Sequence, residues 1–275
     1  MNAAEGENMA RDDKEKGSRS LRALVVIESV VAADRPVAVL DIMSASGLPK
    51  ATAHRLCALL ERRGYLRRDP GGRGLIAGHR LGQLAFAVLS GAGHRSPTHA
   101  ILRRLAREVG ETCNLNVPDG DEMLYIDRVE AEWPLRLQLP VGTRVPLHCT
   151  ASGKLYLSLL PDRDRRALID NLPLDAHTAN TRTEPADLET ELARIRLSGV
   201  GTDDEEFLVG MTAIAVPIID AMGKVCATIA VHAPTARMNL TKAKSHVPAM
   251  RRAAADVAAA FGIEPPARAP RRVAT

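Results

Sequence analysis

The chain has 275 residues, of which 45% are hydrophobic and 25% charged, a composition typical of a soluble globular protein with room for two domains. The most apolar uncharged stretch, residues 207–219, is too short to span a bilayer, and the charged N-terminus does not resemble a signal peptide. The four cysteines form no C-x-x-C pair, which argues against a disulfide framework or a sequence-local zinc site. We therefore expect a cytoplasmic protein with reduced thiols, no bound metal and no cofactor.

The charge is divided unevenly along the chain. Residues 19–95 hold 12 Lys and Arg against 5 Asp and Glu, whereas residues 96–262 hold 19 against 22. A small basic block beside a larger acidic one indicates a part that binds a polyanion, although a solvated basic face is the alternative. With only 3 Phe, 3 Tyr and 1 Trp, a stacking surface for single strands is not expected. Duplex DNA is the favoured polyanion.

The basic block reads as three helices. Ser20 can cap a helix that runs to Val31, and a second helix is expected over residues 39–45. After the Ser46-Gly47 turn, Pro49 suits the first position of a third helix, whose apolar residues recur at steps of three and four. That periodicity leaves outward, near its N-terminal end, the side chains of Lys50, Thr52, His54 and Arg55. This is the part of a recognition helix that enters the major groove.

A basic hairpin follows the third helix. Residues 65–68 read as a strand, residues 69–72 as a turn and residues 73–76 as the returning strand. The hairpin carries Arg67, Arg68 and Arg73 at or near its tip, where they can contact the sugar-phosphate backbone. Each of these residues alone could be an ordinary surface residue, but their order predicts a winged helix-turn-helix domain over residues 19–78.

Residues 79–95 are expected to link this domain to the rest of the chain. The segment from His79 to Leu89 has one apolar stripe, which favours packing on a second copy of the chain, with packing inside its own chain as the alternative. Dimerisation would match a two-fold-symmetric, palindromic operator.

The acidic block, residues 96–262, reads as an α+β domain with a largely antiparallel sheet. Helices are predicted over residues 98–109, 153–160, 162–171, 185–197 and 241–261. Strands are predicted over residues 113–117, 123–129, 135–139, 200–206, 212–219 and 225–232. The two tails, residues 1–18 and 263–275, are expected to be disordered.

The segment PLHCTASGK, residues 146–154, carries a loop of small residues into a helix. Amide groups at such a helix start attract a carboxylate or phosphate, and small side chains let a ligand approach. The segment lacks the glycine and hydroxyl of a nucleotide-binding phosphate loop, and Ser152 and Lys154 do not have the S-x-x-K spacing of a nucleophile pair. The acidic run 203–206 favours a solvated turn over a metal site, with one acid facing the pocket.

Several segments together resemble the IclR family of transcriptional regulators, from about Arg19 to Gly262. They are RALVVIESV, SGLPKATAHRLCALLERRGYLRRD, VGTRVPLHCTASGK, RLSGVGTDDEEFLVGMTAIAVPI and VHAPTARMN. The resemblance implies an N-terminal winged helix, a linker helix that helps to form dimers or tetramers, and a C-terminal GAF-like effector-binding domain. Such proteins bind a promoter operator as repressors or activators and respond to a small metabolite, commonly an organic or aromatic acid.

The resemblance also implies an effector pocket lined by Leu137, Ala151, Ser152, Asp203, Met211, Ala213, Ala230 and His232, with Pro134 at a less certain alignment. Ala213 stands where many members have cysteine, and Ala230 and His232 replace small hydroxyl residues of some acid-binding members. Leu75 replaces a common tyrosine of the wing.

We expect a small carboxylic acid in this pocket. Its apolar body would lie against Leu137 and Met211, helix-start amides near Ser152 would hold the carboxylate, and His232 would donate to it if protonated. Two other functions remain as alternatives: an enzyme whose winged helix binds proteins, and an architectural DNA-binding protein. The basic helix and hairpin, without a nucleophile–base constellation, favour a regulator over the enzyme.

Overall fold

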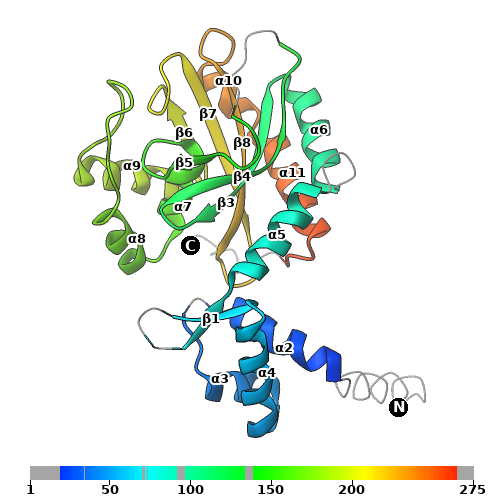
Figure 1. Cartoon of the computed structure of the whole chain (residues 1–275). Coiled ribbons are helices and arrows are strands. Elements are labelled where there is room, and N and C mark those ends of the chain that lie inside the picture. The colour runs from blue at the N-terminus through cyan, green and yellow to red at the C-terminus, as the bar shows by residue number, and fades with distance from the viewer. Residues whose placement is uncertain are drawn as a thin grey trace, which may run out of the picture. The chain divides into compact units, whose positions relative to one another are not determined.

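The structure, a computed structural model, describes residues 19–33, 35–69, 72, 74–91, 97–133 and 139–264. The chain forms two compact units, divided between Val88 and Leu89, and each is described here by itself (Figure 1). No helix of the described part is long and apolar enough to cross a membrane.

The N-terminal unit contains three helices and a two-stranded antiparallel hairpin. They are α2 (Arg19–Val31), α3 (Val39–Ser46), α4 (Lys50–Arg62), β1 (Leu66–Arg68) and β2 (Leu75–Ala77). Gly47 ends α3 in a left-handed conformation (φ 65°), and its amide bonds to the carbonyl of Met43. This tight turn and the extended Pro49 that follows set the change of direction between α3 and α4.

A small apolar core joins these elements. It contains Val26, Val30, Val37, Ile42, Leu56, Cys57, Leu60, Leu66 and Leu75. Leu75 is fully buried, and its backbone pairs with Val37 outside the hairpin, so that β2 is tied to the segment between α2 and α3. The polar side of α4 is consequently left facing solvent, as a winged helix-turn-helix requires.

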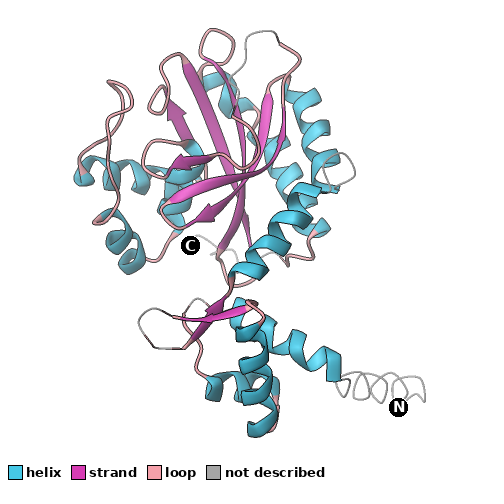
Figure 2. Cartoon of the chain, in the orientation of Figure 1, coloured by secondary structure: helices cyan, strands magenta, loops and turns pink. Residues whose placement is uncertain are grey.

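Helix α5 (His79–Gly91) follows the hairpin, and the second unit contains one six-stranded sheet. The strand order is β5-β4-β3-β8-β7-β6, and every pair is antiparallel, where the sequence predicts a largely antiparallel sheet. Figure 2 shows the strands in magenta. The strands are β3 (Thr112–Asp119), β4 (Glu122–Val129), β5 (Arg144–Pro146), β6 (Gly201–Asp204), β7 (Met211–Ile219) and β8 (Val225–Pro234).

Helices cover both faces of this sheet. The face formed by Leu115, Ile214, Ile229 and Val231 packs on α6 (Pro97–Val109), α10 (Leu240–Ser245) and α11 (Val247–Ala260). Helices α7 (Ala151–Leu159), α8 (Asp162–Ile169) and α9 (Pro185–Ser198) lie on the opposite side (Figure 1). The candidate pocket lies on this second side.

Two glycines allow α7 to lie close to strand β6 and to the segment of chain that precedes the helix. A Cβ on Gly201 of β6 would overlap the carbonyl oxygen of Ala151, and a Cβ on Gly153 would overlap the backbone of Leu147. Both positions therefore require glycine, because the overlapping atoms belong to backbone that cannot rotate away.

Several boundaries differ from the sequence-based expectation. The predicted closing helix is broken at His246, because Pro248 has no amide to donate to the turn before it and its ring crowds that turn. Helix α2 begins before Ser20, so that Ser20 is not its cap, and Pro49 precedes α4 as its N-cap residue. Strand β5 was not expected, and most of the strand expected over residues 135–139 lies outside the described residues.

Candidate effector pocket and nucleic-acid interface

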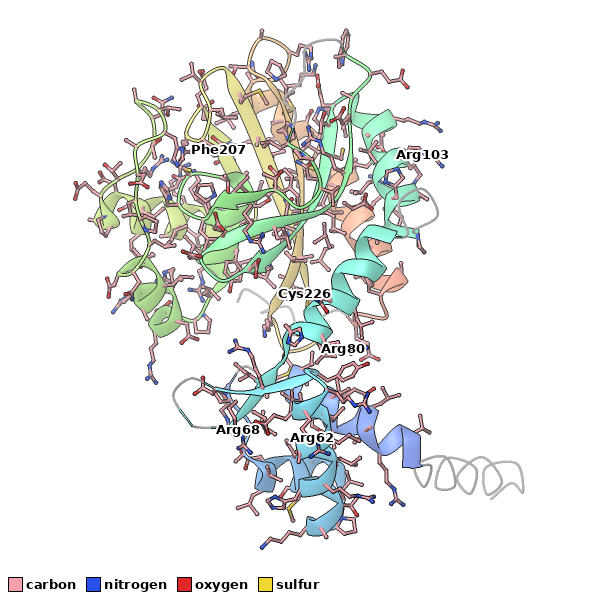
Figure 3. The ribbon with its side chains drawn as sticks, in the orientation of Figure 1. Arg62, Arg68, Arg80, Arg103, Phe207 and Cys226 are labelled. Atoms are coloured by element: carbon pink, nitrogen blue, oxygen red, sulfur yellow. The ribbon has the colours of Figure 1, made fainter. Side chains whose placement is uncertain are left out.

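The recognition helix expected from the sequence is α4, and its polar residues face outward. Lys50, His54 and Arg55 are exposed and Thr52 is half-buried, whereas Ala53, Leu56, Cys57 and Leu60 are buried on the opposite side. Figure 3 shows Arg62 at the C-terminal end of the same helix. Three of the four α4 side chains predicted to contact DNA are thus exposed on the side of the helix away from the core.

Arg67 and Arg68 of β1 are both exposed, although as neighbours on a strand they point to opposite faces of the hairpin, and Arg73 lies outside the described residues. Arg68 Nε bonds to Glu61 Oε1 of α4 at 3.2 Å (Arg68 is labelled in Figure 3). This exposed ion pair connects the hairpin to the recognition helix and partly neutralises Arg68, so that Arg67 is the less compensated cation of the two.

A pocket in the C-terminal unit contains seven of the eight predicted effector residues. Its lining includes Ala151, Ser152, Asp203, Met211, Ala213, Ala230 and His232. The eighth, Leu137, and the less certain Pro134 lie outside the described residues. The rest of the lining, which the sequence analysis missed, is largely apolar: Tyr125, Leu139, Val145, Thr150, Phe207 and Leu208.

The register of the sheet explains how three of these residues meet. Asp203 of β6 pairs with Ala213 of β7, which pairs in turn with His232 of β8. Neighbouring strands lie about 4.8 Å apart, so the Cα atoms of Asp203 and His232 are roughly 10 Å apart with the small Ala213 between them. The pocket therefore has an acid and an imidazole on opposite sides of a flat floor.

A chain of hydrogen bonds fixes the proton of His232. Arg128 Nη1 donates to Asn114 Oδ1 at 3.1 Å, and Asn114 Nδ2 then donates to His232 Nδ1 at 2.9 Å. Because an arginine can only donate, this order makes Nδ1 an acceptor and leaves the proton on Nε2. His232 is buried, and its Nε2 has no partner among the described residues, so it is a donor available to a ligand in the pocket.

The sequence predicts that His232 donates to the ligand if protonated, and the surroundings of the ring bear on that condition. Burial, reinforced by the charge of Arg128, lowers the pKa of His232 to about 3. The imidazole is consequently neutral at physiological pH, and it contributes a hydrogen-bond donor without a positive charge.

The pKa of Asp203 is shifted in the opposite direction, upwards. Burial raises its pKa to about 7, although its Oδ1 accepts hydrogen bonds from the amides of Glu206 (2.8 Å) and Phe207 (3.3 Å). Asp203 therefore caps the loop that follows β6 while its carboxyl group lines the pocket. Its charge changes near neutral pH.

The start of α7 forms a third side of the pocket. Thr150 caps the helix by accepting a hydrogen bond from the Gly153 amide at 3.1 Å, and the amides of Ala151 and Ser152 precede the first bonds within the helix. Asn116 Nδ2 donates to Ser152 Oγ at 2.8 Å. Because Ser152 Oγ accepts this bond, its own hydroxyl proton points away from Asn116. Asn114 and Asn116 are two residues apart on the same face of β3, so the Ser152 and His232 donors lie on one side of the pocket.

The acidic run 203–206 is only partly the solvated turn that the sequence indicated: Asp204 is exposed and Asp203 lines the pocket, but two of the four acids are buried. Asp203 and Glu206 are both 4% exposed. Glu206 pairs with the fully buried Lys154 of α7 and, at 2.6 Å, with Arg182, while Glu191 of α9 lies 3.8 Å from the Lys154 ammonium group. The Lys154 ammonium group thus pairs with buried carboxylates near the loop that follows β6, and it does not serve as a base for the Ser152 hydroxyl.

The sequence contains a weak signal for Asn114 and Asn116, which the sequence analysis did not identify as functional residues. Asn114 and Asn116 alternate with apolar residues in β3, a pattern that usually marks a solvent-facing side, yet they are 0% and 1% exposed. Two buried amides on one strand face indicate a hydrogen-bonding role, but only the neighbouring strands reveal their partners.

Comparison with known proteins places both units in one family. Residues 21–70 match the IclR helix-turn-helix domain, and residues 86–259 match the family described as bacterial transcriptional regulator IclR, C-terminal. A probable transcriptional regulator, SauR of Cupriavidus necator, is 44% identical over 242 residues, which cover 88% of this chain and 96% of that protein.

Solved structures of similar fold support the same family assignment. The crystal structure of the Thermotoga maritima IclR has a TM-score of 0.59 and 28% identity, and the match covers 87% of this chain and 97% of that one. A double mutant of the inducer-binding domain of PobR from Acinetobacter, in complex with 3-hydroxybenzoic acid, has a TM-score of 0.53 and 26% identity, covering 58% of this chain and 94% of that one.

A winged helix-turn-helix unit followed by an effector-binding domain defines a class of DNA-binding transcriptional regulators. The chain belongs to the IclR family within that class. The relatives it matches are transcriptional regulators, which are not enzymes.

Proposed function

We propose that this protein binds a palindromic duplex operator and that a small organic acid in the C-terminal pocket controls the binding. The base-reading residues are Lys50, Thr52, His54 and Arg55 of α4, and the backbone-contacting residues are Arg67, Arg68 and Arg73. The observation that carries the effector half of the proposal is the single pocket that contains Asp203, Ala213, His232 and the start of α7. The chain acts in the cytoplasm, with its winged helix at residues 19–78, its linker at 79–95 and its effector domain at 96–262.

The donors of the pocket favour an anionic ligand. Ala151 and Ser152 at the start of α7 line the pocket together with His232, whose buried Nε2 has no partner among the described residues. A carboxylate held between the helix start and His232 would accept the Nε2 proton. Asp203 on the opposite side accepts a hydrogen bond from a hydroxyl group of the ligand when it is ionised. Tyr125, Val145 and Met211 supply apolar contacts between these ends. A hydroxylated carboxylic acid satisfies all three requirements, and the related PobR domain was crystallised with such an acid.

Calorimetry tests the effector. The full-length protein is titrated with benzoate, 3-hydroxybenzoate and short aliphatic acids with and without a hydroxyl group. We expect binding of at least one carboxylate and tighter binding of its hydroxylated form. Absence of heat with every acid would exclude this ligand class for the pocket.

We propose that the protein binds DNA as a homodimer or homotetramer, with the apolar stripe of residues 79–89 in the contact between copies. Two recognition helices would then meet two half-sites, one helical turn of DNA or a multiple of it apart. Analytical ultracentrifugation of the free protein and of its operator complex measures the number of copies, and a monomer in both would contradict the proposal.

A pair of arginine variants tests the DNA-binding surface. Arg55→Ala is expected to weaken operator binding by roughly 1–3 kcal/mol and to relax the sequence preference at one base pair. The matched control, Arg103→Ala, removes an exposed arginine of α6 in the other unit (Figure 3). Anisotropy titrations with DNA from upstream of the gene, over a salt series, measure both; equal affinities of Arg55→Ala and wild type would contradict the assignment.

A further inference from the structure

Three side chains with metal-binding atoms meet beside the effector pocket, in a group that the proposed regulator function does not use. His148 and Cys149 lie in the segment that enters α7, and His177 lies between α8 and α9. One ring nitrogen of each histidine and the sulfur of Cys149 lie within 4.8 Å of one another. His148 and Cys149 are buried, and His177 is exposed at the open side of the group.

The hydrogen bond of His148 determines which of its ring nitrogens could bind a metal ion. Its Nε2 bonds to the carbonyl oxygen of Asp175 at 3.0 Å, and because a carbonyl only accepts, Nε2 must hold the proton. Nδ1 is therefore the ring nitrogen with a lone pair. A hydrogen bond from the second ring nitrogen to a backbone carbonyl is the usual support of a metal-bound histidine.

Ring contacts and a hydrogen bond hold the segment that carries His177. The His177 ring lies 5.8 Å from the His148 ring and 5.5 Å from the Phe207 ring, measured between centroids. Thr178, the next residue, donates its hydroxyl proton to the Glu205 carbonyl oxygen at 2.6 Å. The three ligand atoms are thus brought together by contacts that do not depend on a metal.

We propose that His148, Cys149 and His177 form a binding site for Zn²⁺ or a zinc-like divalent transition metal. Two imidazole nitrogens and one thiolate are ligands that such ions prefer, and a solvent molecule on the side of His177 completes a tetrahedron. On binding, the Cys149 thiol releases its proton to solvent as the sulfur–metal bond forms. Normal bond lengths require the ligand atoms to approach one another by roughly 1 Å, which side-chain rotation can supply.

The bound ion would join two segments that lie next to the pocket. Cys149 directly precedes Thr150, which caps α7 and lines the pocket, and His177 precedes the threonine that holds the loop after β6. The metal consequently stabilises the arrangement in which the start of α7 and this loop face each other. This site is independent of whether the pocket binds an acid.

The test uses the full-length protein after removal of metal with a chelator. Co²⁺ is titrated as an optical substitute for Zn²⁺, and we expect one ion per chain, sulfur-to-cobalt charge-transfer absorption and visible bands of tetrahedral intensity that Zn²⁺ abolishes. Cys149→Ser and His177→Ala should each weaken Co²⁺ binding at least tenfold. The matched control, Cys226→Ser, changes a partly exposed cysteine outside the group and should bind as wild type does.

His177 is exposed, so its alanine variant should fold even if the buried Cys149→Ser variant does not, and circular dichroism checks both. Absence of stoichiometric Co²⁺ binding by the wild type would overturn the proposal. Retention of the charge-transfer band by Cys149→Ser, or of full affinity by His177→Ala, would overturn it as well.

Discussion

Asn114 donates a hydrogen bond to Nδ1 of His232 at 2.9 Å, and this contact determines which side of the imidazole faces the pocket as a donor. The amide of Asn114 cannot reverse its orientation, because its oxygen already accepts from Arg128. A strand of the sheet thereby sets the hydrogen-bonding character of the pocket through a residue that does not line it.

Replacing Asn114 should change the protonation of His232. In Asn114→Asp the new carboxylate can only accept, so Nδ1 must donate, and the anion raises the pKa of the imidazole. Ring ¹⁵N–¹H NMR, assigned with His232→Gln, should show a neutral ring protonated at Nε2 in the wild type and a doubly protonated ring in the variant. A wild-type ring protonated at Nδ1, or one that titrates near its ordinary pKa, would contradict the hydrogen-bond chain.

Asp203 should make stability depend on pH. Its pKa is raised from 3.8 to about 7, so between these values the folded state holds a proton that the unfolded state has lost, and stability falls as the pH rises. The full effect is on the order of 4 kcal/mol. His232 has the opposite effect on stability, because its lowered pKa makes the free energy of unfolding rise with pH between about 3 and 6.5.

Urea unfolding of wild type and Asp203→Asn from pH 4.5 to 8 separates the two effects. The difference in unfolding free energy, wild type minus variant, should fall steadily as the pH rises towards 7 and level off above it. A difference that does not vary with pH would show that Asp203 titrates in the same range in the folded and unfolded states.

Lys154 should be among the residues most sensitive to substitution. Lys154→Met leaves the buried carboxylates of Glu206 and Glu191 without their central cation, which costs about 3–5 kcal/mol. The double variant Lys154→Met/Glu206→Gln should recover part of this loss, because one of the two buried charges is removed. Urea denaturation at pH 7 measures all three proteins, and a single variant as stable as wild type would contradict the account.

Ala213 should control access to the floor of the pocket. Ala213→Leu places a bulky side chain between Asp203 and His232, and we expect acid binding to weaken about 10- to 100-fold. Operator binding without acid should stay as in the wild type, which serves as the control. Unchanged acid affinity by calorimetry would show that the ligand lies elsewhere.

The sequence predicted the local structure well, because periodicity and turn residues largely determine it. The polar face of α4 and the largely antiparallel character of the sheet followed from spacing, whereas the order of the strands did not, and the family resemblance supplied the pocket residues. Lys154, Glu191 and Glu206 could not be recognised as a buried cluster, since the charges compensate only when α7, α9 and the loop after β6 meet. The orientation of Asn114 likewise depends on Arg128 and His232 of neighbouring strands.

The close approaches at Gly153 and Gly201 have a consequence for the evolution of the protein. A side chain larger than hydrogen at either position would push α7 away from β6 or from the segment that precedes it, so this wall of the pocket tolerates no such change. If the pocket binds the effector as we propose, its chemistry can change by exchange of single lining side chains such as those at positions 213, 230 and 232. Such exchanges would alter the hydrogen-bonding groups of the pocket floor while the backbone contacts at the two glycines stay the same.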